Sequence, residues 1–349
     1  MNELRAPFPW FGGKSRVADL VWERFGPVPN YVEPFAGSLA VLLARPHEPG
    51  VETVNDLDCY LANFWRAVTA EPDTVARWAD EPVNEADIHA RHLWLVCQEG
   101  FRQRMMTDPD YYDAKIAGWW VWGISCWIGS GWCVLPNWSG RISAINSGRG
   151  IHAATVQDRS VARKRPRIAR GGRGVTRQVP DISGANGAAG RGIHASGLEA
   201  KSIAVLDWME ALRDRLRKVR VCCGDWKRVL GKSPTECIGV TAVFLDPPYG
   251  KDAKRQKDIY REDSLDVSEA VREWALQYGD NPLFRIALCG YEGEHKMPPE
   301  WQMVAWKANG GHGNAGNGRG RENAERERVW FSPHCLEPSQ AELFEAVQG

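Results

Sequence analysis

Residues 242–250 read AVFLDPPYG, and this stretch decides the fold class of the chain. Four apolar residues in a row are typical of a buried strand in a parallel sheet, and two prolines end such a strand. In an open α/β sheet, ligands bind beyond the carboxyl ends of the strands. The stretch therefore predicts a strand over residues 242–245 that delivers Asp246 and its neighbours into a ligand site.

The residues after this strand suit chemistry on a nucleobase amine. The lone pair of an adenine amine is delocalised into the ring, so a catalyst should accept hydrogen bonds from both N–H groups. The Asp246 carboxylate and the Pro247 carbonyl are two such acceptors, and the Pro247-Pro248 pair stiffens the backbone that holds them. Tyr249 offers a flat face for a base taken out of the duplex stack. The alternative is an ordinary turn with Asp246 and Tyr249 on the surface.

The sequence on both sides of this strand repeats an α/β pattern, interrupted once. We expect strands at residues 31–33, 52–55, 219–223, 284–289 and 328–331, and helices at 17–25, 38–44, 57–69 and 268–278. From residue 84 to 217 the composition changes to a helical part, a Trp-rich part (119–138) and a Gly/Arg-rich part. The pattern predicts a Rossmann-like α/β domain, residues 1–83 and 218–349, with an inserted region, 84–217.

The overall composition excludes several classes of protein. The chain has 349 residues, 43% of them hydrophobic and 25% charged, which is enough to bury a core. We expect a soluble, cytoplasmic protein, because neither a signal peptide nor a membrane span of ~18 apolar residues is found. The nine cysteines form no C-x-x-C pair. They favour reduced core thiols over disulfides or a zinc knuckle.

Two motifs near the N-terminus identify a family when they are taken with residues 246–249. Residues 9–14 read PWFGGK, and residues 31–38 read YVEPFAGS. In this order the motifs resemble the Dam-like (class alpha) DNA adenine N6-methyltransferases, over roughly residues 1–70 and 218–335. Residues 259–260, 290–291 and 328–333 are similar to later elements of that family. The resemblance implies a Rossmann-like methyltransferase sheet and methyl transfer from S-adenosyl-L-methionine to the N6 amine of adenine in double-stranded DNA, with base flipping.

The resemblance also implies which residues act. The catalytic residues would be Asp246, Pro247, Pro248 and Tyr249. The cofactor contacts would come from Trp10, Gly12, Gly13, Lys14, Glu33, Pro34, Phe35, Ala36, Gly37, Asp56, Asp225, Trp226 and Asp246.

Two of these positions have other interpretations. Asp56 ends the second expected strand, where nucleotide-binding units place an acid on the ribose hydroxyls, but it could instead cap a helix. Residues 12–15 are not a phosphate-binding loop, because that pattern needs a glycine where this chain has Phe8.

The inserted region carries the expected contacts to DNA. Between Arg159 and Arg177 there are eight Lys or Arg residues and no acid, and the tripeptide G-R-G recurs at 148–150, 172–174 and 190–192. Cations bind phosphates and read base edges. The residues expected to bind DNA are Arg149, Arg163, Lys164, Arg165, Arg167, Arg170, Arg173 and Arg191; a solvated loop is the alternative.

The other unusual side chains of the inserted region have simpler explanations. The Trp-rich segment at 119–138 is expected to build a small core, and the alternative is that one ring wedges into the base stack. His152 and His194 have no partner at metal-ligand spacing, so we expect no metal.

One competing function can be excluded from the sequence, and three others cannot. Cytosine C5 methylation needs a nucleophilic cysteine after a proline, and the chain has no Pro-Cys pair. Methylation of the cytosine N4 amine, an RNA substrate and a catalytically silent DNA-binding protein stay open as alternatives. We expect a monomer. The sequence leaves open whether the protein is phage-encoded, belongs to a restriction-modification system or acts alone.

Overall fold

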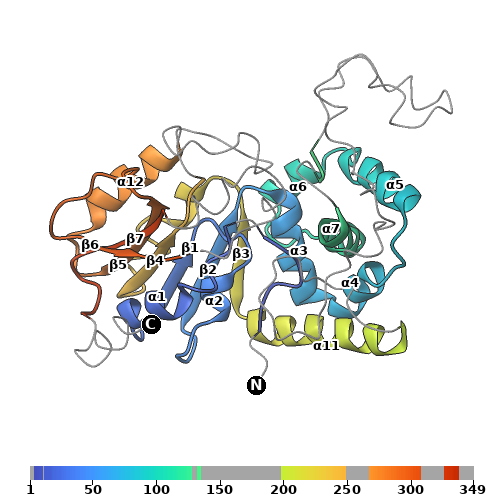
Figure 1. Ribbon diagram of the computed structural model, residues 1–349, viewed down its shortest axis with the longest axis horizontal. Coiled ribbons are helices and arrows are strands. Elements are labelled where there is room, and N and C mark those ends of the chain that lie inside the picture. The colour runs from blue at the N-terminus through green and yellow to red at the C-terminus, as the bar shows by residue number, and fades with distance from the viewer. Residues whose placement is uncertain are drawn as a thin grey trace, which may run out of the picture.

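The computed structural model describes residues 4–10, 12–127, 132–134, 198–248, 267–307 and 326–337. Within these residues the chain forms one seven-stranded sheet in the order β3-β2-β1-β4-β5-β7-β6 (Figure 1). The strands are β1 (Asn30–Glu33), β2 (Val51–Asp56), β3 (Val219–Cys223), β4 (Thr241–Leu245), β5 (Phe284–Tyr291), β6 (Gln302–Ala305) and β7 (Glu327–Phe331). This mostly parallel sheet, covered by helices, has a Rossmann-like methyltransferase fold.

The directions of the strands decide which residues meet at each edge. β1 pairs in parallel with both β2 and β4, and the parallel pairing continues to β3 on one side and to β5 on the other. β7 is antiparallel to both β5 and β6, so β6 runs in the same direction as β5. The carboxyl ends of six strands therefore lie along one edge.

Helices cover the sheet and form a separate group beyond β3 (Figure 1). Their bounds are α1 (Ala18–Phe25), α2 (Ala40–Leu43), α3 (Cys59–Ala70), α4 (Pro72–Ala79), α5 (Glu85–Val96), α6 (Phe101–Thr107), α7 (Ala114–Cys126), α11 (Leu198–Leu216), the 3₁₀ helix η2 (Trp226–Val229) and α12 (Val267–Tyr278). No helix in the described ranges is long and apolar enough to cross a membrane.

Successive strand residues point to opposite faces of the sheet, and helices cover both faces, so both faces are buried. Tyr31 and Phe244 pack with the helices α1, α3 and α11 in the larger core, whereas Val32 and Leu245 pack with α12 and η2 in the second core. All four side chains are buried. This double cover explains the unbroken apolar run before Asp246, since a strand buried on both faces has no solvent-facing position.

The six strands and four helices expected from the sequence are confirmed, with ends that differ by at most two residues. The strand β6 and the helices α4 and α11 were not expected. β6 is a short edge strand with exposed side chains on one face, so its pattern is weak and its pairing with β7 alone defines it. The α11 sequence directly follows the Gly/Arg-rich segment and has a mixed pattern of charges.

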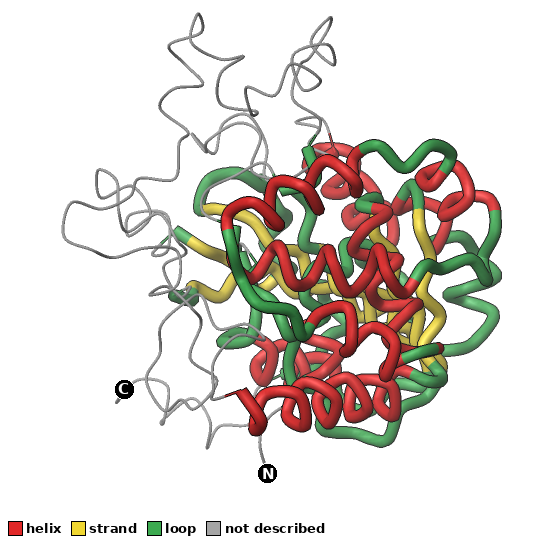
Figure 2. Tube along the Cα trace, turned by 90° about the vertical axis from the view of Figure 1, so that its right-hand side faces the viewer, coloured by secondary structure: helices red, strands yellow, loops and turns green. Residues whose placement is uncertain are grey.

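The helical group and the sheet share one core. α7 packs against α3 and α4, and α11 packs against the same two helices. Figure 2, seen from the helical side, shows these helices in front of the strands. Residues on both sides of residue 84 thus belong to the same hydrophobic core. The division into a catalytic domain and an insert at 84–217 stays a prediction.

The tryptophans of the helical group are core residues, as expected, but they belong to the larger core that the helices share with the sheet. Trp120, Trp122 and Trp132 are buried. Trp122 donates from Nε1 to the Glu81 carbonyl at 2.8 Å, and Trp132 donates to the Trp120 carbonyl at 3.1 Å. Trp138 lies outside the described residues. All nine cysteines are free thiols, and five of them are buried.

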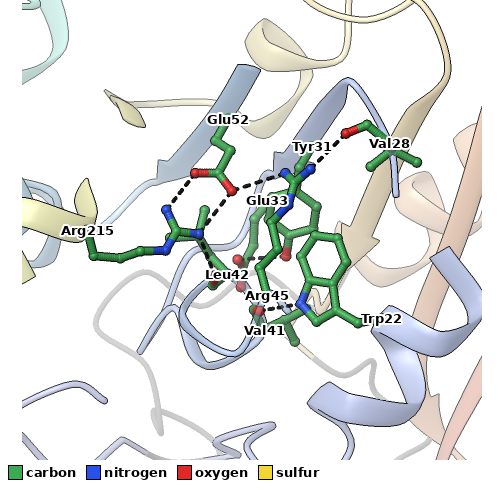
Figure 3. A network of polar contacts seen from close by, with 9 residues as sticks. All are labelled: Trp22, Val28, Tyr31, Glu33, Val41, Leu42, Arg45, Glu52 and Arg215. Carbon is green, nitrogen blue, oxygen red and sulfur yellow. Dashed lines mark hydrogen bonds and ion pairs between the residues drawn. The ribbon is translucent and has the colours of Figure 1, made fainter. Parts of the chain in front are cut away.

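A buried ion network fastens α11 to the sheet (Figure 3). Glu52 of β2, whose side chain is 2% exposed, pairs with Arg215 at 2.7 Å and with Arg45 at 3.1 Å. Arg215 also donates to the Leu42 carbonyl at 2.8 Å, and Arg45 donates to the Val28 carbonyl at 2.7 Å. The helix that returns the chain from residues 135–197 is therefore held against β2 and α2.

Candidate active site

Four parallel strands deliver polar residues to the same edge of the sheet. β1 ends at Glu33, β2 ends at Asp56, β3 is followed by Gly224-Asp225, and β4 is followed by Asp246. The chain order reverses between β1 and β4, and such a switch point is where open α/β sheets bind ligands. The candidate residues of the separate motifs therefore meet at one site.

The N-terminal Gly-Gly-Lys motif reaches the catalytic motif through one ion pair. The Lys14 ammonium lies 2.8 Å from Oδ2 of Asp246. It also donates to the Gly12 carbonyl at 2.8 Å, and Gly12 has a φ of 73° that allows this turn. Lys14 is buried, whereas the Asp246 side chain is 23% exposed and can be reached by a substrate. A cation at this distance stabilises the negative charge, and an ionised carboxylate is an acceptor of hydrogen bonds only.

Asn55 holds the turn that follows β1. Its amide donates to the Pro34 carbonyl at 3.1 Å and to the Gly224 carbonyl at 3.0 Å, while its own backbone carbonyl accepts from Ala36 N at 2.9 Å. The loops after β1 and β3 are thus joined through one buried side chain of β2. No motif pointed to Asn55, although an amide next to the acid that ends a buried strand is a signal that could have found it.

Gly37 is required at the tip of this turn. Its φ is 47°, and a Cβ there would lie 2.7 Å from Nε1 of Trp10. Its carbonyl accepts from Nε1 of Trp65 at 3.2 Å. Trp10 of the first motif therefore packs directly on the glycine of the second motif, which explains why both motifs occur together.

Asp56 locks the same turn. Its Oδ2 accepts from Gly37 N at 3.1 Å and its Oδ1 accepts from Asp58 N at 2.8 Å. Burial raises the pKa of Asp56 to about 7, against these backbone donors, which favour the ionised form. The helix-cap interpretation is wrong, because the side chain that caps α3 is Asp58, which accepts from Tyr60 N at 2.9 Å.

Glu33 ends β1 and is buried. The residue is 2% exposed, and its Oε2 accepts from the Tyr31 hydroxyl at 2.9 Å. Burial raises the pKa of Glu33 to about 8, and the Tyr31 hydrogen bond lowers it by less. Direct contact between Glu33 and a cofactor stays a prediction.

Two aromatic rings flank the edge beside β3. Phe35 and Trp226 lie 6.1 Å apart between ring centroids, with an angle of 32° between their planes. Asp225 is exposed and caps η2, because its side chain accepts from Lys227 N at 2.9 Å. An acid at a strand end together with aromatic faces suits a nucleoside, whose ribose offers hydroxyl donors and whose base offers a flat ring. The residues present therefore fit S-adenosylmethionine.

Several predicted positions lie outside the described residues. They are Tyr249, Phe11 of the first motif, residues 259–260, His152, His194 and all the residues expected to bind DNA. The other late elements are placed: Gly290-Tyr291 ends β5, and residues 328–331 belong to β7.

A comparison with family models agrees with this arrangement. Residues 10–91 match the model of the D12 class N6 adenine-specific DNA methyltransferases. The matched segment contains Lys14, the Pro34–Gly37 turn and Asp56, and it ends before Asp246. A search of the curated proteins found no match. Over this segment the chain is similar to the D12 class N6 adenine-specific DNA methyltransferases, and the similarity together with the sheet order supports methylation of the N6 amine of adenine in DNA.

Proposed function

We propose that S-adenosyl-L-methionine is the methyl donor and that Asp246 and Pro247 hold the adenine amine during transfer. The observation that carries the proposal is the 2.8 Å ion pair between Lys14 and Asp246 at the carboxyl edge of the sheet, because it unites the first motif with the catalytic one. When bound, S-adenosylmethionine supplies an electrophilic methyl group. Its adenosine part would be held by Phe35, Asp56, Asp225 and Trp226, near Trp10.

The residues of this chain would act on the amine as follows. The Asp246 carboxylate and the Pro247 carbonyl accept its two N–H bonds and point the nitrogen lone pair at the methyl group. Lys14 occupies one acceptor position of the carboxylate, which has several. The amine would take up the methyl group that bound S-adenosylmethionine supplies, and Asp246 or water would then accept the proton that the methylated amine releases. Tyr249 would stack on the base after it leaves the duplex.

We further propose double-stranded DNA as substrate, bound by the basic residues 159–177 and the arginines of the three G-R-G repeats. Their positive charge supports contacts to phosphates, and the neighbouring glycines support a close approach of the backbone. The enzyme would act as a monomer in the cytoplasm. Sequencing of methylated product DNA would give the recognition sequence.

Substitution of Asp246 tests the chemical proposal. Asp246→Asn should lower the single-turnover rate by about 100-fold or more, while the Kd for S-adenosylmethionine changes little, because the acceptor that it removes acts mainly in the transition state. The measurements are transfer of a labelled methyl group to unmethylated duplex DNA, nucleoside analysis by mass spectrometry and calorimetric cofactor binding.

The matched control is Asp280→Asn, at a fully exposed position between α12 and β5, at the opposite edge of the sheet. This variant should keep the wild-type rate. A wild-type rate in Asp246→Asn would overturn the proposal, and label in N4-methylcytosine would contradict the family assignment.

A further inference from the structure

Trp306 lies at the active-site edge of the sheet, although no motif pointed to it. β6 runs in the same direction as β4 and β5, and Trp306 is the first residue beyond its carboxyl end. Its backbone is fixed there, since Trp306 N donates to the Glu327 carbonyl at 3.2 Å. Trp306 and Asp246 therefore follow strands that end at the same edge.

The indole contacts the lysine that pairs with the catalytic carboxylate. The Lys14 ammonium lies 5.7 Å from the ring centroid of Trp306 and 2.8 Å from Asp246. A cation at this distance is attracted by the ring face. Trp306 thus shares one neighbour with Asp246, and a base whose amine reaches Asp246 comes close to the indole.

The N–H of this indole is an unpaired donor. It is shielded from solvent and has no hydrogen-bond partner among the described residues. Trp22 and Trp65, in contrast, donate to backbone carbonyls. Trp119 is also unpaired, but it lies among the helices beyond β3. A buried donor without an acceptor bears its full desolvation cost, so an acceptor brought by a substrate would stabilise the complex.

Adenine carries an acceptor on each side of its amine. When the N6 group donates to Asp246 and Pro247, the ring nitrogens N1 and N7 flank it. We propose that the indole N–H of Trp306 donates a hydrogen bond to one of these two ring nitrogens of the target adenine. This inference rests on the proposed role of Asp246. The side chains that shield the N–H must move aside when the base enters.

Substituted bases in DNA test this contact. Trp306→Phe keeps a ring for Lys14 and removes the N–H. Single-turnover methylation is measured on duplexes with adenine, 7-deazaadenine or 1-deazaadenine at the target position, at saturating S-adenosylmethionine. The variant should be about tenfold slower than wild type on adenine, as expected when one hydrogen bond is removed. The analogue that lacks the bonded nitrogen should slow wild type about tenfold further than it slows Trp306→Phe, for the same reason.

Control variants separate this contact from other effects. Trp274→Phe makes the same change in the second core, on α12, and should keep the wild-type rates and the wild-type response to both analogues. Thermal melting and cofactor affinity show whether Trp306→Phe is folded.

Two outcomes would overturn the inference: a wild-type rate for Trp306→Phe on adenine, or equal slowing of wild type and variant by both analogues. An active Asp246→Asn variant would instead refute the proposed function itself, so the two failures are distinguishable.

Discussion

Glu33 is a carboxyl group in the interior of the sheet, and its pKa is raised from 4.5 to about 8 by burial. Between these two values the folded protein keeps a proton that the unfolded chain has released. The free energy of unfolding therefore falls as pH rises through this window, by up to about 1.4 kcal/mol per pH unit from this group.

Glu33→Gln resembles the protonated side chain and removes this dependence. We expect the variant to gain stability relative to wild type as pH rises from about 5 to about 8, the window set by the two pKa values. Urea unfolding at several pH values measures the difference. Glu48→Gln, on the exposed loop before β2, is the control and should follow wild type. A constant difference between Glu33→Gln and wild type would show that Glu33 is ionised in the fold.

Asp56 has a pKa raised to about 7 by burial, so pH should control its ability to accept the ribose hydroxyls. The ionised form is the better acceptor. The Kd for S-adenosylmethionine should therefore fall as pH rises from about 6 to about 8, and Asp56→Asn should bind about tenfold more weakly with a flatter pH profile. Calorimetry measures both. A wild-type affinity in this variant would remove Asp56 from the cofactor site.

At the scale of elements, Arg215 links α11 to the sheet through partly buried polar contacts. Arg215 makes two bonds to Glu52 and one to the Leu42 carbonyl. Arg213 is 40% exposed and pairs with its neighbour Asp214. The two arginines of one helix therefore differ in burial and partners, which makes them a matched pair.

Arg215→Met should lower the free energy of unfolding by about 2 kcal/mol, less than for a fully broken buried pair because Arg45 still faces Glu52. Arg213→Met should change it by less than about 0.5 kcal/mol. Chemical denaturation checks both values. Equal losses of stability in the two variants would show that the network does not hold the helix.

At the scale of the whole molecule, a net charge of zero conceals a local excess of basic residues. The chain has 44 basic and 44 acidic side chains, yet residues 159–177 carry eight basic side chains and no acidic one. A variant with Arg163, Lys164, Arg165 and Arg167 all changed to Ser should bind duplex DNA more weakly.

The affinity of this variant for DNA should also depend less on salt. The slope of the logarithm of the binding constant against the logarithm of the salt concentration should become shallower by about 0.9 for each phosphate that the variant no longer neutralises. Fluorescence anisotropy at several salt concentrations measures the slope, and cofactor affinity should stay unchanged. An unchanged slope would assign DNA binding to other parts of the chain.

What the sequence by itself determined are the features with local signals. The buried strand before Asp246 was predictable because an apolar run followed by a polar residue is a short-range pattern. The family was predictable because its motifs are contiguous. The parallel sheet followed from alternating strands and helices.

Only the tertiary structure decided which residues far apart in the chain meet. The Lys14–Asp246 pair, the Asn55 bridge between two loops and the Glu52 network each join side chains from different elements. The positions of β6 and Trp306 are set by backbone pairing with β7, the neighbour of β6 in the sheet. Such contacts follow from the path of the whole chain, so no local pattern of residues could have predicted them.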